Sequence, residues 1–194
     1  MRRVAIIGPA GAGKTTLALE LGQILGLEVV QLDRLFWQPG WVKTSDAECE
    51  AIQRVALEGD DWITDSVAPR ALRTRLEAAD TLVFLDLPLR LCALRALRRR
   101  IRTRGRTRVE VASGCVPGRV DHAARRYLRY VLTYRAETRP HILRELDRLS
   151  PGRRVVVLRA PHEVRQFVDD LRYPAPRTDG HTRSEERRAA VRVG

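Results

Sequence analysis

Eight residues near the N-terminus have the types and the spacing of a loop that binds phosphate. They read GPAGAGKT, from Gly8 to Thr15, and match the pattern G-x-x-x-x-G-K-[ST] without deviation. Glycines let consecutive backbone N–H groups converge on phosphate oxygens, while Lys14 reaches the β- and γ-phosphates and the Thr15 hydroxyl binds Mg²⁺. We therefore predict binding of ATP or GTP with Mg²⁺. The predicted nucleotide contacts are Gly8, Pro9, Ala10, Gly11, Ala12, Gly13, Lys14, Thr15 and Thr16.

The residues on either side of this loop place it where a phosphate loop has to be. The apolar run Arg3–Gly8 predicts a buried strand, and Lys14 to about Leu25 predicts a helix that Gly26 ends. The positive end of that helix adds to anion binding. The alternative is an ordinary glycine turn before a helix. Of the 36 Lys and Arg residues only Lys14 and Lys43 are lysines, which favours a chemical reason for a lysine in the loop.

Acidic residues follow three of the predicted strands. Asp65 ends the run Trp62–Asp65 and is the best candidate for the acid that holds the Mg²⁺ shell, with a helix cap or a surface acid as the alternative. Asp33 follows the strand predicted at residues 27–32, and either orients an acceptor hydroxyl or a metal-bound water or has no role in function. Asp86 is interpreted as the N-cap of the next helix.

Cationic and aromatic residues complete the candidate site. Phosphoryl transfer requires cations around the transferred group, and Arg102 and Arg106 are candidates within a run of arginines that also fits a solvated basic face. Arg70 is placed to contact an acceptor phosphate. Trp37 can stack on a flat substrate, although Trp37 and Trp41 equally fit a local hydrophobic cluster.

Strands that alternate with helices along the chain predict the fold class. Parallel sheets covered by helices on both faces arise from this order, so we predict an α/β P-loop NTPase with a five-stranded parallel sheet and a helical, Arg-rich lid at about 99–120. An aromatic loop is expected at residues 33–41. The other expected strands are 81–86 and 154–158, and the other expected helices are 46–58 with Ser45 as cap, 69–79, one from Leu87, 121–149 interrupted at Pro140, and 162–171.

Length and composition bound the remaining possibilities. A chain of 194 residues with 44% hydrophobic residues is typical of one globular domain, which we place at residues 1–172, followed by a disordered basic tail at 173–194. No apolar run approaches the roughly 20 residues that cross a bilayer, and no signal peptide is seen. We therefore expect a cytoplasmic protein without a membrane partner. The three cysteines have neither disulfide nor zinc spacing.

The order of these segments resembles the adenylate kinase superfamily of small P-loop kinases. The segments GPAGAGKTT, LDRLFWQPGW, WITD, FLDLP and RGRTR resemble, more closely, the bacterial DNA topology modulation protein family, also called FlaR-related. The resemblance covers roughly residues 1–172 and implies an adenylate kinase-like fold that binds a nucleotide. Adenylate kinases have D-G-F-P-R after the third strand, whereas this chain has Asp65 to Arg70 as DSVAPR, so the resemblance does not supply the acceptor.

Two functions fit these residues. The first is a kinase that transfers the γ-phosphoryl group of Mg-ATP to a small-molecule or nucleotide acceptor. The second is a nucleotide-dependent, nucleic-acid-binding regulatory protein, which the formal net charge of +12 and the family name favour. The loop, the strand-end acids and the arginines of the expected lid favour the kinase.

Overall fold

The computed structural model describes residues 1–32, 37–38, 42–65, 72–102, 129–131 and 133–174. The strands are β1 (Arg3–Ile7), β2 (Val29–Gln31), β3 (Trp37–Gln38), β4 (Val42–Lys43), β5 (Trp62–Asp65), β6 (Thr81–Leu85) and β7 (Arg154–Leu158). The helices are α1 (Lys14–Leu25), α3 (Asp46–Ala56), α4 (Leu72–Ala78), α5 (Leu89–Arg102), the π-helix η2 (Tyr134–Thr138), α7 (Arg139–Leu149) and α8 (Pro161–Arg172). Among the described helices, none combines the length and the apolar character needed to span a membrane.

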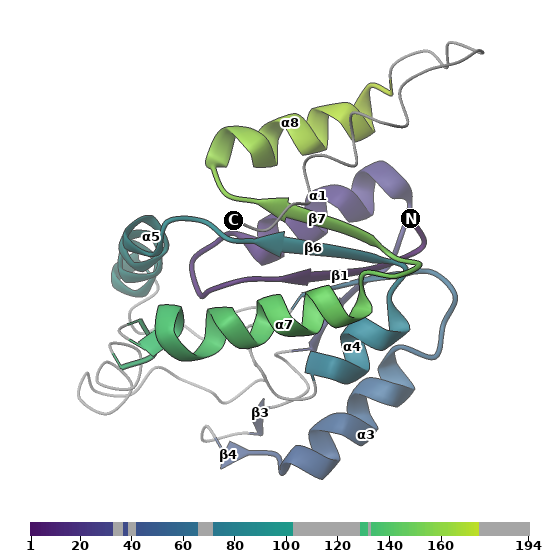
Figure 1. Ribbon diagram of the computed structural model, residues 1–194, viewed down its shortest axis with the longest axis horizontal. Coiled ribbons are helices and arrows are strands. Elements are labelled where there is room, and N and C mark those ends of the chain that lie inside the picture. Colours follow the sequence, from purple (N-terminus) through teal and green to yellow (C-terminus); the bar gives the residue numbers. More distant parts are fainter. Residues whose placement is uncertain (33–36, 39–41, 66–71, 103–128, 132, 175–194) are drawn as a thin grey trace.

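Five parallel strands form the central sheet, in the order β2-β5-β1-β6-β7 (Figure 1). The predicted fold class is therefore confirmed. Strand β1 lies in the middle, paired with β5 on one side and with β6 on the other. Parallel pairing brings the carboxyl ends of β1, β5 and β6 to one edge of the sheet, so the residues that follow these strands are neighbours in space.

Helices cover both faces of the sheet and build two hydrophobic cores. Helices α1 and α8 lie on one face, and α3, α4 and α7 lie on the other (Figure 1). Leu21 of α1 and Phe167 of α8 belong to the first core. Leu76 of α4 and Ile142 of α7 belong to the second. Strands buried on both sides have to be apolar throughout, which explains the run VAII in β1.

Local sequence signals set several helix boundaries. Helix α1 begins at Lys14 and ends at Leu25, as predicted, because Gly13 and Gly26 both adopt left-handed backbone conformations, with φ of 95° and 68°. Helix α3 begins after Ser45, whose hydroxyl accepts a hydrogen bond from the Glu48 amide while the Glu48 carboxylate accepts one from the Ser45 amide. This capping box was also predicted from the sequence.

Two segments differ from the sequence-based expectation or refine it. The aromatic loop expected at residues 33–41 contains strand β3, which pairs antiparallel with β4; tryptophan and valine favour this extended pairing. The helix expected at 121–149 lies within the described residues from residue 129 onward, apart from residue 132. Its π-helix η2 gives way to the α-helix α7 at Arg139, immediately before Pro140. Proline lacks an N–H donor and crowds the preceding turn, and the Arg139 amide instead donates to the Tyr134 carbonyl, five residues back.

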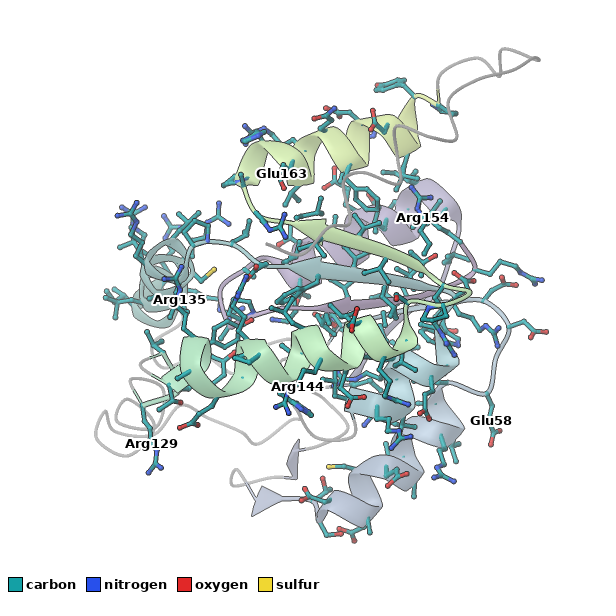
Figure 2. All side chains as sticks on the ribbon, in the orientation of Figure 1. Glu58, Arg129, Arg135, Arg144, Arg154 and Glu163 are labelled. Atoms are coloured by element: carbon teal, nitrogen blue, oxygen red, sulfur yellow. The ribbon has the colours of Figure 1, made fainter. Side chains whose placement is uncertain are left out.

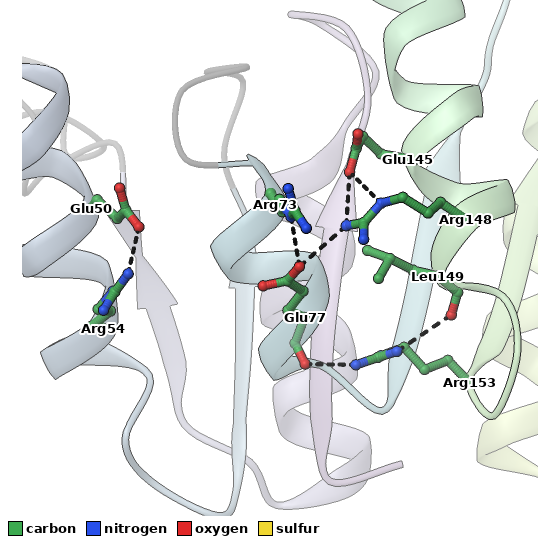
Figure 3. A network of polar contacts seen from close by, with 8 residues as sticks. All are labelled: Glu50, Arg54, Arg73, Glu77, Glu145, Arg148, Leu149 and Arg153. Carbon is green, nitrogen blue, oxygen red and sulfur yellow. Dashed lines mark hydrogen bonds and ion pairs between the residues drawn. The ribbon is translucent and has the colours of Figure 1, made fainter.

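Ion pairs join α4 to α7 on the outer side of the second core (Figure 3). Glu77 of α4 accepts from Arg73 at 2.7 Å and from Arg148 of α7 at 3.2 Å. Arg148 also pairs with Glu145 on its own helix, and the Arg153 guanidinium donates to the Glu77 carbonyl at 2.9 Å. Arg73, Glu77 and Arg148 are exposed to solvent, so each ion pair contributes at most about 1 kcal/mol. The network orders the C-terminal end of α7, far from the carboxyl edge of the sheet.

The Asp80 carboxylate connects the amino ends of two central strands, β1 and β6. Its carboxylate accepts hydrogen bonds from the backbone amides of Arg2 and Arg3, at 2.9 and 2.8 Å, and from the Thr81 hydroxyl at 2.6 Å. Burial raises the pKa of the Asp80 carboxyl, but these hydrogen bonds outweigh it and leave the pKa below its ordinary value. The ionised form is therefore the one that stabilises the fold.

We expect Asp80→Ala to lower the free energy of unfolding by about 1–3 kcal/mol near pH 7, because two backbone amides and a hydroxyl lose a charged acceptor. Since the folded-state pKa is depressed, this contribution is present above the unfolded-state pKa of about 4 and is lost as the pH falls through the folded-state value. Urea unfolding of both proteins at several pH values measures it. An equal difference at neutral and strongly acidic pH would contradict the role of the charge.

Candidate active site

The loop between β1 and α1 lies at the carboxyl edge of the sheet and leads directly into a helix N-terminus. The Ala12 amide donates to the Pro9 carbonyl at 3.1 Å, and the Leu17 amide donates to the Gly13 carbonyl at 2.9 Å. Gly13 is the N-cap, so no side chain caps α1, and the first turn contains no acidic residue. The first amides of the helix thus lack the usual side-chain acceptor, which makes this terminus suited to an external anion.

Glycine is required at two positions of the loop for different reasons. A Cβ at Gly11 would collide with the carbonyl oxygen of Cys92 in α5 and would stand 3.2 Å from the Ala96 Cβ, at a φ of +85°. A Cβ at Gly13 would meet no atom within 4 Å, although its φ of +95° disfavours a side chain. The loop is therefore packed against α5 on one side and open at the start of α1. The open side is where phosphate oxygens could approach the backbone.

Lys14 folds its side chain back over the loop. Its Nζ donates to the Pro9 carbonyl at 3.0 Å, and the residue is only 5% exposed. A buried ammonium group requires compensating acceptors, and a phosphate group would supply stronger ones than a carbonyl. The cation predicted to bind the β- and γ-phosphates is thus held inside the loop.

Thr15 and Asp65 meet at the mouth of the loop. The Thr15 hydroxyl donates to Asp65 Oδ2 at 2.5 Å, and Asp65, the last residue of β5, is 5% exposed. The parallel register pairs Asp65 with Ile6 of β1, which explains how residues 50 apart in sequence come together. A hydroxyl and a carboxylate are both oxygen ligands of the kind that Mg²⁺ takes, so these residues fit a magnesium ion shared with phosphates.

We expect Asp65→Asn to weaken Mg-ATP binding by about 10- to 100-fold while changing ATP affinity measured without Mg²⁺ much less, because the lost carboxylate acts on the metal. Titration calorimetry with and without Mg²⁺ measures both. Asp61→Asn is the matched control, since Asp61 immediately precedes β5 at its amino end and pairs with Arg2. Equal losses in the two titrations would contradict a metal role for Asp65.

Most of the remaining predicted site residues cannot be placed against the loop. Asp33, Arg70 and Arg106 lie outside the described residues, as does the greater part of the expected lid. Trp37 contributes its backbone to β3. Arg102 is the last residue of α5 and is exposed, and Thr16 is exposed in the first turn of α1. The structure thus brings together the loop, Lys14, Thr15 and Asp65.

A second acid at this edge has a partner that the sequence analysis missed. Asp86, directly after β6, accepts hydrogen bonds from the Arg139 guanidinium, at 2.9 Å from Nε to Oδ1 and 2.7 Å from Nη2 to Oδ2. The expected N-cap role is therefore corrected: α5 begins at Leu89, and the Asp86 carboxylate is held by α7. These hydrogen bonds raise the pKa of Arg139, which stays cationic. In the sequence, the position of Asp86 at the end of a predicted strand marked it as a candidate. No pattern near Asp86 or near Arg139 indicated that the two residues pair.

Basic side chains are abundant at this end of the molecule. Arg129 and Arg135 precede α7 and lie at the end of the molecule where that helix begins (Figure 2). Helix α5 carries exposed Arg90, Arg95, Arg98 and Arg102 and no acidic residue. The carboxyl edge of the sheet therefore lies in a positively charged environment, which favours binding of an anionic ligand.

Comparison with solved structures relates this arrangement to known proteins. Shikimate kinase from Acinetobacter baumannii in complex with shikimate matches with a TM-score of 0.55 at 16% identity, over 88% of this chain and 90% of that one. The chain has the P-loop kinase fold. The Gly8–Thr15 loop, whose sequence has the P-loop pattern, follows the central strand β1 of this fold.

Further kinase structures match with lower TM-scores. A sugar kinase from Janibacter sp. HTCC2649 has a TM-score of 0.46 at 19% identity, over 89% of this chain and 90% of that one. Deoxyadenosine kinase from M. mycoides with bound dCTP has a TM-score of 0.42 at 12% identity, over 87% and 97%. No protein-family model and no curated protein matches the sequence.

Proposed function

We propose that this chain is a phosphotransferase that binds Mg-ATP, or Mg-GTP, in its P-loop and transfers the γ-phosphoryl group to a small-molecule or nucleotide acceptor. The observation that carries the proposal is the contact between Thr15 and Asp65 at the mouth of the loop. A glycine turn without a nucleotide role would not require a buried carboxylate at this point. Together with the buried ammonium of Lys14, the contact provides one site for a metal ion and one for phosphate oxygens.

Each residue of the site has a role in this reaction. The loop amides and the first turn of α1 bind phosphate oxygens and fix the phosphate chain in line for attack. Lys14 neutralises charge on the β- and γ-phosphates, and Thr15 and Asp65 hold the metal shell. The magnesium ion, when bound, supplies a Lewis acid for the phosphate oxygens. Arg102 and Arg106 are further candidates to neutralise charge in the transition state.

The acceptor is proposed to enter over the carboxyl ends of β2 and β5. Strand β5 ends at Asp65, so an acceptor beside it would face the γ-phosphate. Asp33 follows β2 and would orient the attacking hydroxyl, with Trp37 and Arg70 as further acceptor contacts. Residues 1–172 would form the kinase domain, with the lid at about 99–120 and a basic, disordered tail at 173–194, in a cytoplasmic protein.

A second candidate function rests on charge. The formal net charge of +12 and the resemblance to the DNA topology modulation family support a nucleotide-dependent protein that binds nucleic acid. Such binding weakens steeply with salt, since it releases counterions from the phosphate backbone. The kinase remains the first proposal because α5, the helix that packs against the P-loop at Gly11, carries several exposed arginines.

An acceptor screen tests the proposed function. Purified protein is incubated with ATP labelled at the γ-position, Mg²⁺ and one acceptor class at a time: nucleoside monophosphates, nucleosides and small hydroxylated metabolites. The kinase proposal requires labelled product with one class, absent in Lys14→Ala. Phosphate release without any labelled product, stimulated by duplex DNA at low salt, would instead favour the nucleic-acid-linked function.

A further inference from the structure

The ion pair between Asp86 and Arg139 directly follows, at Asp86, a residue that touches the P-loop. A Cβ at Gly8 would stand 2.8 Å from the Leu85 carbonyl oxygen, so the first residue of the loop touches the last residue of β6. Gly11 touches Cys92 in the same way. Asp86 lies in the short connection between these two contact points. Asp86 and its partner Arg139 therefore lie on the β6 side of β1, whereas Asp65 lies on the β5 side.

The geometry of the pair leaves one edge of the guanidinium available. Arg139 uses Nε and Nη2 for the Asp86 carboxylate, at 2.9 and 2.7 Å. Of the five guanidinium N–H groups, both on Nη1 and one on Nη2 remain. Within the described part of the chain, Nη1 has no hydrogen-bond acceptor. The Arg139 side chain is 36% exposed against 9% for Asp86, so the guanidinium is open to a further partner while the carboxylate is largely covered.

The backbone immediately before Arg139 forms a π-helix, which sets the position of Arg139. The wide turn of η2 ends at Arg139, and such turns are frequent at functional sites. Tyr134, the first residue of η2, is 2% exposed, yet its hydroxyl has no hydrogen-bond partner among the described residues. Burial, with Tyr130 and then the Asp86 carboxylate as smaller contributions, raises the pKa of Tyr134 far above its ordinary value, so the hydroxyl keeps its proton. Buried hydroxyl groups in folded proteins nearly always have a hydrogen-bond partner, so the Tyr134 hydroxyl is a second available donor close to Asp86 and Arg139.

We propose that Arg139 binds the phosphate chain of the nucleotide held in the P-loop, and that Asp86 is the positioning residue that presents the guanidinium to it. The ligand class is a nucleoside triphosphate, recognised here through its phosphate oxygens. The inference rests on the proposed function, since it requires a phosphate chain at Gly8–Thr16. It adds a cation on the β6 side of the loop, distinct from Arg102 and Arg106, the candidates predicted in the lid.

The first test compares arginines on one helix. Arg139→Gln is expected to weaken binding of ATP and of inorganic tripolyphosphate by about 10- to 100-fold, the loss expected for a charge-assisted hydrogen bond to an anion. Adenosine binding should not change, because adenosine carries no phosphate. Arg148→Gln is the matched control, since Arg148 pairs with Glu77 and Glu145 near the other end of α7. Calorimetric titration measures all three ligands, and thermal unfolding checks that the variants are folded.

The second test uses the sign of the effect at Asp86. If Asp86 merely stood near the phosphates, Asp86→Asn would remove a repelling charge and tighten tripolyphosphate binding. If Asp86 positions Arg139, the same substitution weakens binding, and Asp86→Glu restores part of it. The double variant Asp86→Asn with Arg139→Gln should then bind no more weakly than Arg139→Gln alone, because both changes remove one interaction.

The outcomes separate this inference from the proposed function. Weaker tripolyphosphate binding in Arg139→Gln and Asp86→Asn, with normal binding in Arg148→Gln, supports the inference. Normal binding in Arg139→Gln, or tighter binding in Asp86→Asn, overturns it while the P-loop function stands. A wild-type protein that binds neither ATP nor tripolyphosphate would overturn the inference together with the proposed function.

Discussion

Lys14→Ala is expected to lower the rate of ATP turnover by at least about 100-fold, the largest functional effect of any single substitution in this chain. The ammonium group is 5% exposed and held on the Pro9 carbonyl inside the loop. No other described side chain places a positive charge within the loop itself. Because charge on the transferred group builds up in the transition state, losing this cation should lower the turnover rate as well as nucleotide affinity.

The chain supplies its own control for this substitution. Lys43 is the one other lysine, so Lys43→Ala removes the same chemical group from a segment outside the P-loop. Turnover is measured as transfer or release of labelled γ-phosphate at saturating Mg-ATP, and circular dichroism establishes that both variants are folded. A folded Lys14→Ala protein with the turnover rate of Lys43→Ala would mean that the loop does not act on the phosphates.

Gly11→Ala is expected to lower the free energy of unfolding by about 2–5 kcal/mol, the largest stability effect we predict. The added Cβ would collide with the Cys92 carbonyl of α5 while the residue keeps a φ of +85°, so overpacking adds about 1–3 kcal/mol to a left-handed strain of about 1–2 kcal/mol. The obstacle is backbone within a helix and cannot rotate aside. Either the loop or α5 has to move, and we therefore also expect weaker nucleotide binding.

Gly152→Ala isolates the collision from the strain. Gly152 has a φ of +80°, close to that of Gly11, but a Cβ there would meet no atom within 4 Å. Its substitution should lower stability by about 1–2 kcal/mol, from strain alone. Urea unfolding of the three proteins gives both differences. Equal losses at Gly11 and Gly152 would contradict the close packing of the P-loop on α5.

The P-loop and the sheet could be predicted from sequence because their signals are local. The strand, the glycines, Lys14 and Thr15 are contiguous, and Gly26 marks the helix end where the structure has it. Asp65 is 50 residues from Thr15, yet a strand ending in an acid was enough to suggest it, since parallel strands share one carboxyl edge. The hydrogen bond between the two residues is seen in the structure, whereas their metal role stays a prediction.

The Asp86–Arg139 pair could not be predicted because it depends on tertiary packing. The two residues are 53 positions apart, and a chain with 36 basic residues offers many arginines with no local signal to select one. By sequence, the acid before Leu87-Pro88 is explained by a helix cap, and only the packing of α7 on the sheet shows that its partner is Arg139. The residues predicted to bind the acceptor are not compared with the structure for a different reason, since Asp33 and Arg70 lie outside the described residues.

The most direct test of the central claim is amide hydrogen exchange, followed by mass spectrometry, with and without Mg-ATP. The claim predicts slower exchange in peptides that contain Gly8–Thr16, because the loop amides would bind phosphate oxygens. Adenosine should not produce this protection, and neither should Mg-ATP in Lys14→Ala. Unchanged exchange in these peptides at saturating Mg-ATP would contradict the claim that this loop is a nucleotide site.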